Sequence, residues 1–597
     1  MKSRGFYRLL ALLFAFAMVA AACGSDSEGG SSDDTTATTE AVETTEETTA
    51  TTEADTVIEE SDETRAYGGE ISIGLESEAT GLRPWEDSMS SPALNMAGTI
   101  FDRLFEQDID GNYLPMLATS GEGNEDFTEW TVGLREGVTF HNGVAFSADT
   151  IIEAWPIWQV GAISAGQISA SNLTAIEKTG DFEVKYILSQ PNSAFLAYLQ
   201  GSGLGMIFEP GAAAADPDGF TNEPVGTGPF VIESRDLDNE TVVVRNDSYW
   251  GMDPEGNQLP FLDKINFRPI PDEGTRLDSL LSGTVNGMHA LRQATIRDAR
   301  DAGDTIKLFE HQGNNSGGGM YNTLVPPFDD VRVRNGLTLL NAQEQVIDAL
   351  GGTGISLPTT QYFSADSPWY SETVAAAWPR YDFEAGVAKL TEYVDDPARS
   401  DGKAVGEKMD VELSCPPDPS LITAMQVLEQ AWTASELVNV TLTNFDQQTH
   451  INNALGAPPD FTGSHGAHCW RWSDDVDPSI VMNSEFAPPN SAIAEAAGIP
   501  GVVSPLNFSN YFNGDMFTAL AGAIRTGSFD ERFALYEQAN LIIAEETPIW
   551  YSGGTATMIA VEPNIFGLNE WHLPSGELGI GFPSAVGRWQ EVWVVAS

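Results

Sequence analysis

The chain has 597 residues, a length typical of roughly three or four domain-sized units. Its 87 Asp and Glu residues against 29 Lys and Arg residues give a formal net charge of −58, which argues against a nucleic-acid binder and against a polybasic membrane contact. Because 42% of the residues are hydrophobic and 10% are aromatic, most of the chain is predicted to be globular. Three cysteines are too few for a disulfide-stapled scaffold.

The N-terminus predicts export from the cytoplasm. Two arginines and a lysine precede an apolar run at residues 9–19, which has the length of a signal-peptide core and is too short to span a membrane. Small residues then lead to Cys23, and this arrangement resembles the lipobox of bacterial lipoproteins. The resemblance implies a signal peptide at residues 1–22 and a lipid anchor on Cys23; the alternative is an ordinary signal peptide with an incidental cysteine. No later stretch is long and apolar enough to span a bilayer, so the remaining chain is expected outside the cytoplasm.

Residues 23–66 are predicted to be a disordered tether behind the lipidated cysteine. From residue 24 onward this segment carries 14 acidic residues and one basic residue, Arg65, with almost no side chain that could form a core. The sequence pattern changes at residues 67–74, where apolar and polar residues alternate as in a β-strand.

The body is predicted to be α/β with mixed sheets. Ser147 is placed to cap a helix that runs through Trp155. Residues 409–443 follow a βαβ pattern, in which two alternating strands flank a helix with apolar residues at helical spacing, so the two strands should be parallel. Residues 528–531 form a capping box that opens another helix, ended at Thr547 before a proline.

The two cysteines of the C-terminal half are predicted to be bridged. Cys415 follows the strand at residues 409–414, and Cys469 follows an expected strand at residues 460–468. Neighbouring strands lie about 5 Å apart, and the exterior of the cell is oxidising, so a Cys415–Cys469 disulfide is expected. His465, His468 and Cys469 could also be a metal cluster, but their spacing is not a strong zinc pattern and a disulfide would consume the thiol. No metal site and no cofactor is therefore predicted.

Several strings along the chain carry a family resemblance. In order they are FDRLF at 101–105, LREGVTFHNG at 134–143, PVGTGPF at 224–230, YNT at 321–323 and WSDDVDP at 472–478. Together they resemble the family 5 extracellular solute-binding proteins of ABC importers, the oligopeptide, dipeptide and nickel-binding group. The resemblance covers nearly all of the chain from residue 67 onward.

The resemblance implies a two-lobed, periplasmic-binding-protein-like fold of type II with an extra small domain. Lobe I is expected at residues 67–318 plus 553–597, with the small domain inserted at about 116–223, and lobe II at residues 319–552. Within the strings, Gly226 and Gly228 suit a turn of unusual φ before a new strand. His141 is interpreted as a histidine that supports a turn rather than as a catalytic group.

The resemblance also indicates a ligand site. In peptide-binding relatives, a carboxylate in a segment of the form Trp-x-x-Asp-x-x-Asp/Glu-Pro holds the α-ammonium group of the ligand. Counted back from Pro478, the matching position here is Asp474. A charge-assisted hydrogen bond offsets the desolvation of both groups. The remaining residues assigned to the site are Trp470 and Trp472 as walls, Arg471 as a partner for a ligand carboxylate, and Tyr321 and Asn322 from the YNT string.

The predicted function is that of a lipid-anchored, extracytoplasmic receptor. It would close two lobes around a peptide or another small solute and deliver it to the membrane subunits of an ABC permease. Two alternatives remain: a secreted hydrolase, and a subunit on the same fold that reports its solute to a membrane sensor. The hydrolase has little support, because the sequence holds no nucleophile elbow, zinc-protease helix, phosphate loop or dinucleotide turn.

Overall fold

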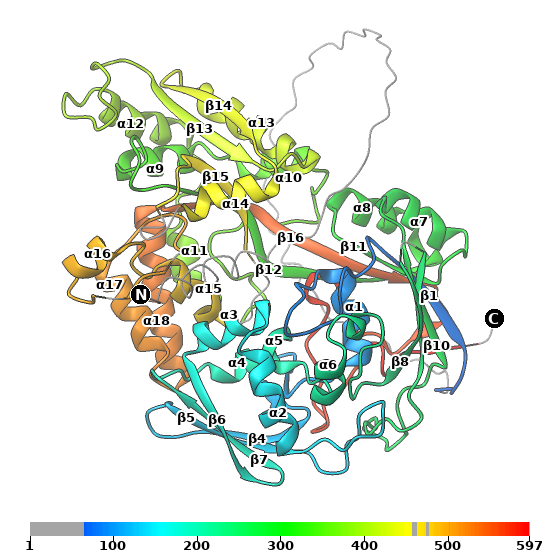
Figure 1. The fold of residues 1–597 in the computed structure, drawn as a ribbon. Coiled ribbons are helices and arrows are strands. Elements are labelled where there is room, and N and C mark those ends of the chain that lie inside the picture. Colours follow the sequence, from blue (N-terminus) through cyan, green and yellow to red (C-terminus); the bar gives the residue numbers. More distant parts are fainter. Residues whose placement is uncertain are drawn as a thin grey trace.

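The largest element of the fold is a ten-stranded mixed sheet (Figure 1). The computed structural model describes residues 65–237, 239–456, 462–472, 477–500, 502–504 and 506–595, with backbone alone at 314–316, 447–448 and 471. The predicted signal peptide, Cys23 and the tether up to residue 64 lie outside these residues. In spatial order the strands are β14 (Val438–Asn444), β13 (Met409–Cys415), β15 (Ala467–Arg471), β12 (Lys307–Tyr321), β16 (Ile549–Val561), β11 (Gly287–Ala290), β1 (Glu70–Leu75), β10 (Lys264–Pro269), β9 (Glu240–Arg245) and β8 (Phe230–Asp236).

The pairing directions confirm that the sheet is mixed. β1 runs parallel to β10 and β11, and β13 runs parallel to β14 and β15. The contacts of β12 with β15 and β16 are antiparallel, as are those of β9 with β8 and β10. The parallel strands need helical crossovers, which explains why helices cover the sheet.

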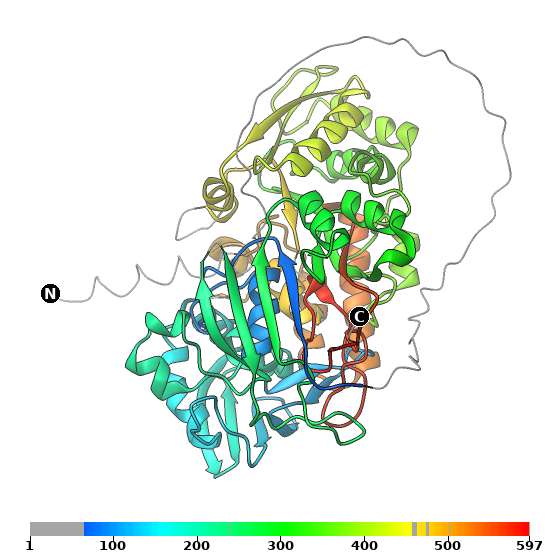
Figure 2. The ribbon, with the colours of Figure 1, turned by 90° about the vertical axis from the view of Figure 1, so that its right-hand side faces the viewer.

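The two longest strands lie at the centre of the sheet and run from one half of the molecule to the other. β12 and β16 pair antiparallel over most of their lengths. Figures 1 and 2 show the part that contains β13 and β14 on one side of this pair and the part that contains β1, β8 and β10 on the other. These two strands therefore connect the two halves of the fold.

A second, antiparallel sheet lies in the half of the molecule that contains β1, β8 and β10. Its order is β4 (Ala118–Gly123), β5 (Glu129–Leu134), β7 (Glu183–Leu188) and β6 (Leu173–Gly180). Ser147 accepts a hydrogen bond from the backbone N–H of Asp149 and caps a helix at 148–158, as predicted. The helices of the N-terminal half are α1 (Ser91–Ile100), α2 (Ala148–Trp158), α3 (Ala162–Ser171), α4 (Phe195–Gln200), α5 (Ser202–Gly205), α6 (Pro210–Ala215), α7 (Glu273–Leu281) and α8 (Gln293–Asp301). Two short ribbons complete the strands, β2 (Phe105–Gln107) with β3 (Tyr113–Pro115) and β17 (Ile565–Phe566) with β18 (Trp593–Val594).

The βαβ unit predicted at 409–443 is present. β13 and β14 pair in parallel, and the helix between them buries Met425, Leu428 and Trp432 on the face that its spacing predicts. Ser528 caps the last long helix, which ends at a left-handed Thr547. The helices of this half are α9 (Val331–Leu339), α10 (Gln343–Ala349), α11 (Glu372–Ala377), α12 (Phe383–Val394), α13 (Pro419–Thr433), α14 (Gln447–Leu455), α15 (Pro478–Glu485), α16 (Ser491–Ala496), α17 (Gly514–Ala523) and α18 (Phe529–Glu546).

The PVGTGPF string contains glycine for a reason other than the predicted one. Neither Gly226 nor Gly228 has a positive φ. A Cβ at either position would instead lie 2.0 Å or 2.5 Å from the backbone of Ile100, so both glycines permit close packing of two chain segments. His141 supports the same turn: its Nδ1 accepts from the Gly226 N–H and its Nε2 donates to the Gly228 carbonyl.

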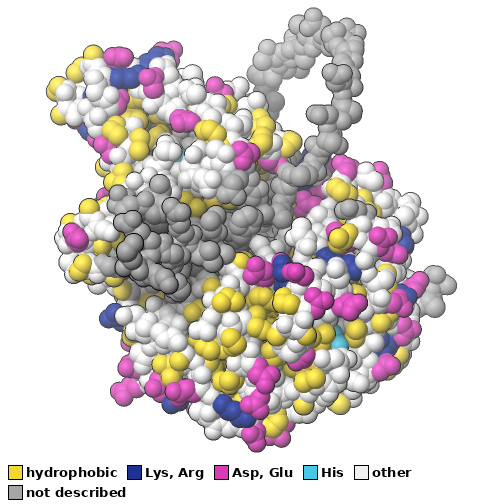
Figure 3. Space-filling model, viewed as in Figure 1, with side chains coloured by type: hydrophobic (Ala, Val, Ile, Leu, Met, Phe, Trp, Pro, Cys, Tyr) yellow, Lys and Arg dark blue, Asp and Glu magenta, His cyan; other side chains and the backbone are white. Residues whose placement is uncertain are grey.

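The described surface is rich in carboxylates (Figure 3). Acidic side chains are spread over this face, while Lys and Arg side chains lie at scattered points. Within residues 65–595, excluding the gaps given above, no helix combines the length and the apolar character needed to cross a membrane.

Candidate functional site

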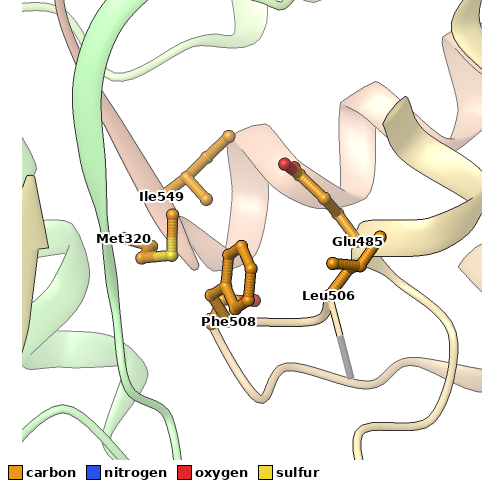
Figure 4. Close-up of a pocket in the computed structure, with 6 residues that line it drawn as sticks. Met320, Glu485, Leu506, Phe508 and Ile549 are labelled. Carbon is orange, nitrogen blue, oxygen red and sulfur yellow. The ribbon is translucent and has the colours of Figure 1, made fainter. Parts of the chain in front are cut away.

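A small cavity lies where the two central strands meet α15 and the loop before α17. Met320 from β12 and Ile549 from β16 form one side, and Leu506, Phe508 and Ser509 form the other. Figure 4 shows Met320, Phe508 and Ile549 facing one another, while Glu485 extends from the end of α15. The cavity has room for about one water molecule, so a solute of dipeptide size requires the walls to separate.

Glu485 places a carboxylate in this otherwise apolar wall. Its Oε2 accepts a hydrogen bond of 2.6 Å from the Tyr362 hydroxyl and one of 2.9 Å from Nε1 of Trp472. Burial, followed by the charge of Glu485, raises the pKa of Tyr362 well above its ordinary value. Tyr362 therefore stays neutral and donates to Glu485 across the accessible pH range.

The segment that carries Asp474 is fixed at both ends. Before it, the indole of Trp472 is 2% exposed and is bonded to Glu485. After it, Asp477 caps α15 and accepts two hydrogen bonds, of 2.7 Å and 2.9 Å, from Nη2 of Arg532. Both ends are thus anchored by buried polar contacts.

The residues predicted to form the ligand site differ in their distance from the cavity, and two of them are not described. Asp474 and the side chain of Arg471 lie outside the described residues, so their assignments stay predictions. Trp470 is partly buried and its ring lies 4.7 Å from that of Phe508, which lines the cavity. Trp472 is one layer behind the cavity and contacts it through Glu485.

Tyr321 and Asn322 are buried and do not line the cavity. Tyr321 is fully buried, with its ring 4.7 Å from that of Trp550. Asn322, also fully buried, donates to the carbonyls of Gly463 and His465. Their neighbour Met320 lines the cavity because successive side chains of a strand point to opposite faces. Neither residue lines this cavity, and their assignment to the ligand site stays a prediction.

The Cys415–Cys469 disulfide is present, with the two Cα atoms 5.3 Å apart. The strand that carries Cys469 runs over 467–471 rather than over the predicted 460–468, so this cysteine lies within a strand. Parallel pairing sets Ser414 opposite His468, which brings the next residue of each strand together. No group of described His, Cys, Asp and Glu residues has an arrangement that could hold a metal ion.

A second small cavity lies in the other half of the molecule beside α1. Asp102, Glu106 and the partly buried Arg588 line it, and together with the neighbouring Arg103 we call them the ion cluster. Glu106 pairs with Arg103 at 2.9 Å and with Arg588 at 2.8 Å. Asp102 accepts hydrogen bonds from Thr227, Tyr249 and Trp250.

Every charge of the ion cluster has polar or charged partners within the same half of the molecule. Burial raises the pKa of Asp102 despite its three donors, and burial lowers the pKa of Arg588 to about 10. Both groups keep partners at short distance, so the cluster is suited to hold chain segments together rather than to exchange a ligand.

Sequence reasoning missed Glu485, Phe508 and Ser509. Glu485 ends a helix whose pattern predicts only an amphipathic surface, and the other two residues lie in an irregular loop. No spacing in the sequence connects them to Met320 or to Ile549. The one available signal was proximity to the WSDDVDP string, since Glu485 follows it within the same helix.

Comparisons with known proteins agree with this architecture. The model of the bacterial extracellular solute-binding proteins, family 5, matches residues 112–491. The dipeptide-binding protein of Escherichia coli (strain K12) is 25% identical over 500 residues, which cover 77% of this chain and 85% of that protein. Heme-binding protein A of Haemophilus influenzae is 25% identical over 508 residues, which cover 77% and 83% of the two chains.

A solved structure shows the same fold. The ABC transporter-associated periplasmic binding protein DppA from Helicobacter pylori, in complex with the peptide STSA, superimposes with a TM-score of 0.68 at 20% identity. The match covers 89% of this chain and 99% of that one. The predicted fold class, a periplasmic-binding-protein-like fold of type II with mixed sheets, is confirmed.

Proposed function

This chain belongs to the bacterial extracellular solute-binding proteins of family 5, the substrate-binding components of ABC importers, and we propose that it is a lipid-anchored receptor for peptides or a similar small solute. The observation that carries the proposal is the pair of described residues that flank Asp474 in sequence. Trp472 on one side contacts Glu485 of the cavity, and Asp477 on the other side is held by Arg532. Asp474, between them in sequence, is proposed to hold the ammonium group of the solute.

We place the hinge in the two central strands, at the boundaries 318/319 and 552/553 between the proposed lobes. The β12–β16 ladder changes register between Gln312 and Ser316 and again between Gly317 and Gly318. On the other strand Gly553 has a φ of +134°, a conformation that L side chains rarely adopt. Irregular pairing weakens the ladder at these points, so bending there disturbs the fewest hydrogen bonds.

The residues that line the cavity all belong to lobe II, so closure would bring lobe I against its open side and enclose the solute between the lobes. The proposed small domain already contacts the other lobe through Ser193, whose N–H donates to the Ile524 carbonyl at 2.8 Å. Ile480 of α15 packs against the large core of the first lobe. A solute that contacts both lobes would favour this closed arrangement over an open one.

The nature of the solute can be tested by thermal unfolding. Free di- and tripeptides should raise the unfolding temperature, because a ligand at a hundred times its dissociation constant stabilises the native state by about 2.7 kcal/mol. The same peptides with an acetylated N-terminus should give little shift, since they lack the ammonium group. If only heme or a metal chelate stabilises the protein, the peptide assignment is wrong. Release of more than one product molecule per protein would instead favour a hydrolase.

Membrane anchoring through Cys23 has its own test. Cys23→Ser removes the thiol that would carry the lipid, so the variant should be recovered as soluble or unprocessed protein. Fractionation and mass measurement of the mature N-terminus separate these outcomes. A variant that is normally processed and still retained in the membrane would contradict the lipoprotein assignment.

A further inference from the structure

Three of the seven histidines of the chain form a buried group beside the solute cavity. His450 lies on α14, His465 precedes β15, and His468 lies on β15. The rings of His450 and His468 stack with centroids 3.5 Å apart, and the ring of His465 lies 4.8 Å from that of His468. All three side chains are buried, and we call them the histidine cluster.

Each ring uses one nitrogen to donate a hydrogen bond. The acceptors are the Cys469 carbonyl at 3.0 Å for Nε2 of His450, the Asn453 carbonyl at 3.4 Å for Nδ1 of His465, and the Ser414 hydroxyl oxygen at 3.0 Å for Nδ1 of His468. The Ser414 hydroxyl itself faces the Ala467 carbonyl at 3.5 Å and can donate to it. The carbonyl acceptors fix the neutral tautomers of His450 and His465, and the weak bond from Ser414 to the Ala467 carbonyl leaves the hydroxyl oxygen to accept from His468.

The other nitrogen of each ring has no hydrogen-bond partner although it is buried. These atoms are Nδ1 of His450, Nε2 of His465 and Nε2 of His468. In the neutral tautomers they are lone pairs, which are the positions where a proton would add. A proton added there would create a buried cation, for which the described residues supply a further backbone acceptor only at His465, from Phe508. Such a group is costly unless the site opens to water.

The described surroundings of the cluster contain no counter-charge that acts on the rings. Ser414 of β13, Asn453 of α14, Trp470 of β15 and Phe508 of the following loop pack against the cluster. Among the described residues no Asp, Glu, Lys or Arg of these elements influences the three rings electrostatically; the interactions are with backbone groups and with one another. Burial lowers the pKa of His450 and of His465 to about 4, and lowers that of His468 well below its ordinary value.

A continuous set of rings connects the cluster to the cavity. Trp470 stacks on His468 with centroids 6.2 Å apart, and its other neighbour, Phe508, lies 4.7 Å away and lines the cavity. β15 then leads directly into the segment that carries Asp474. Separation of α14 from β15 would therefore move a wall of the solute site.

We propose that the histidine cluster is an acid-sensitive switch, in which proton uptake separates α14 from β15 and lowers the affinity of the adjacent site for its solute. The opening step rests on the cluster alone. Its effect on solute binding rests on the proposed function.

The sign of the effect follows from proton linkage. The closed state holds pKa values near 4, whereas an opened, hydrated histidine titrates near 6.5, so the open state binds more protons between these values. The contribution of the cluster to stability is therefore complete above pH 6.5 and is lost as the pH falls toward 4. Between pH 7 and pH 5, each such histidine shifts the equilibrium toward the open state by about twentyfold.

Amide hydrogen exchange of the full mature protein tests the opening step without any solute. Protection of α14 and β15, corrected for the intrinsic exchange rate at each pH, should fall at least twentyfold from pH 7 to pH 5. The strands β5 and β7 of the small sheet, which carry no histidine, serve as the internal reference and should change less. Equal protection of α14 and β15 at both pH values would overturn the proposal.

Variants assign the effect to the cluster. His450→Gln keeps an amide donor for the Cys469 carbonyl but removes the titrating lone pair, so the fall in protection should shrink by about twentyfold. His141→Gln is the matched control, because His141 is a partly buried histidine whose two ring nitrogens are both bonded. An equal reduction in both variants would overturn the proposal. Stabilisation of α14 by added Zn²⁺ at pH 7 that is lost in His450→Gln would also overturn it, by assigning the cluster to metal binding.

Discussion

The ion cluster and the histidine cluster are both polar groups beside cavities, but they differ in how the cost of burying polar atoms is met. In the ion cluster, Glu106 lies between two arginines and Asp102 receives three donors. In the histidine cluster, three rings remain uncharged and each leaves one nitrogen without a hydrogen-bond partner. The first arrangement resists change, and the second can change its charge within the range of pH that cells meet.

The difference matches the positions of the two clusters. The ion cluster joins segments far apart in sequence, from residues 102–106 to residue 588, within one half of the molecule. The histidine cluster contacts the strand that leads into the anchored segment of the solute site. A rigid polar network is therefore located where the fold needs connection, and a titratable one where the proposed function needs movement.

The largest effect is expected from breaking the ion cluster. Arg588→Met removes one cation from Glu106 and should lower the free energy of unfolding by about 3–5 kcal/mol, because it leaves a buried charge with less compensation. Urea denaturation gives this value. Lys178→Met removes a cation of comparable length from the exposed pair with Asp149 and should cause no measurable change. Equal losses in the two variants would remove the ion cluster from the account of stability.

A smaller effect is expected from opening the disulfide beside the histidine cluster. Replacing both Cys415 and Cys469 with alanine should lower the free energy of unfolding by about 2–4 kcal/mol, since the bridge closes a loop of 54 residues in the unfolded chain. A reducing agent should lower the stability of the wild type by the same amount and leave the double variant unchanged. Thiol labelling of unreduced, denatured protein should find neither cysteine free; two labelled thiols would contradict the bridge.

The smallest effect is expected from removing one of the hydrogen-bond donors to Asp102. Tyr249→Phe removes one of three hydrogen bonds and should lower the free energy of unfolding by about 1–2 kcal/mol. Tyr67→Phe, which removes a bond from an exposed hydroxyl to the Gln258 carbonyl, should be neutral. A loss for Tyr249→Phe as large as that for Arg588→Met would show that hydrogen bonds, rather than paired charges, dominate the ion cluster.

Local patterns explain why parts of this fold were predictable. The βαβ unit at 409–443 and the caps at Ser147 and Ser528 follow from periodicity and from neighbouring residues, and all are present. The disulfide followed from the same strand assignment, although the strand that carries Cys469 begins seven residues later than expected.

The rest depends on contacts that sequence spacing does not contain. Tyr321 and Asn322 belong to a family string. Tyr321, at the end of β12, packs in the core against Trp550, and Asn322, the next residue, donates to the Gly463 carbonyl. Gly226 and Gly228 reflect the approach of a distant backbone rather than an unusual φ. The histidine cluster was missed because His450 joins the other two only through the packing of α14 on β15.

The account rests on a solute with an ammonium group bound at Asp474, and calorimetric titration of the wild type and Asp474→Asn tests this most directly. Free peptides should bind the variant well over tenfold more weakly, since loss of one partner of a buried pair typically costs about 2–5 kcal/mol. N-acetylated peptides should bind the wild type poorly for the same reason, and the thermal stability of the ligand-free variant should stay unchanged. Equal affinities for free and acetylated peptides in both proteins would remove Asp474 from the site and contradict the proposed function.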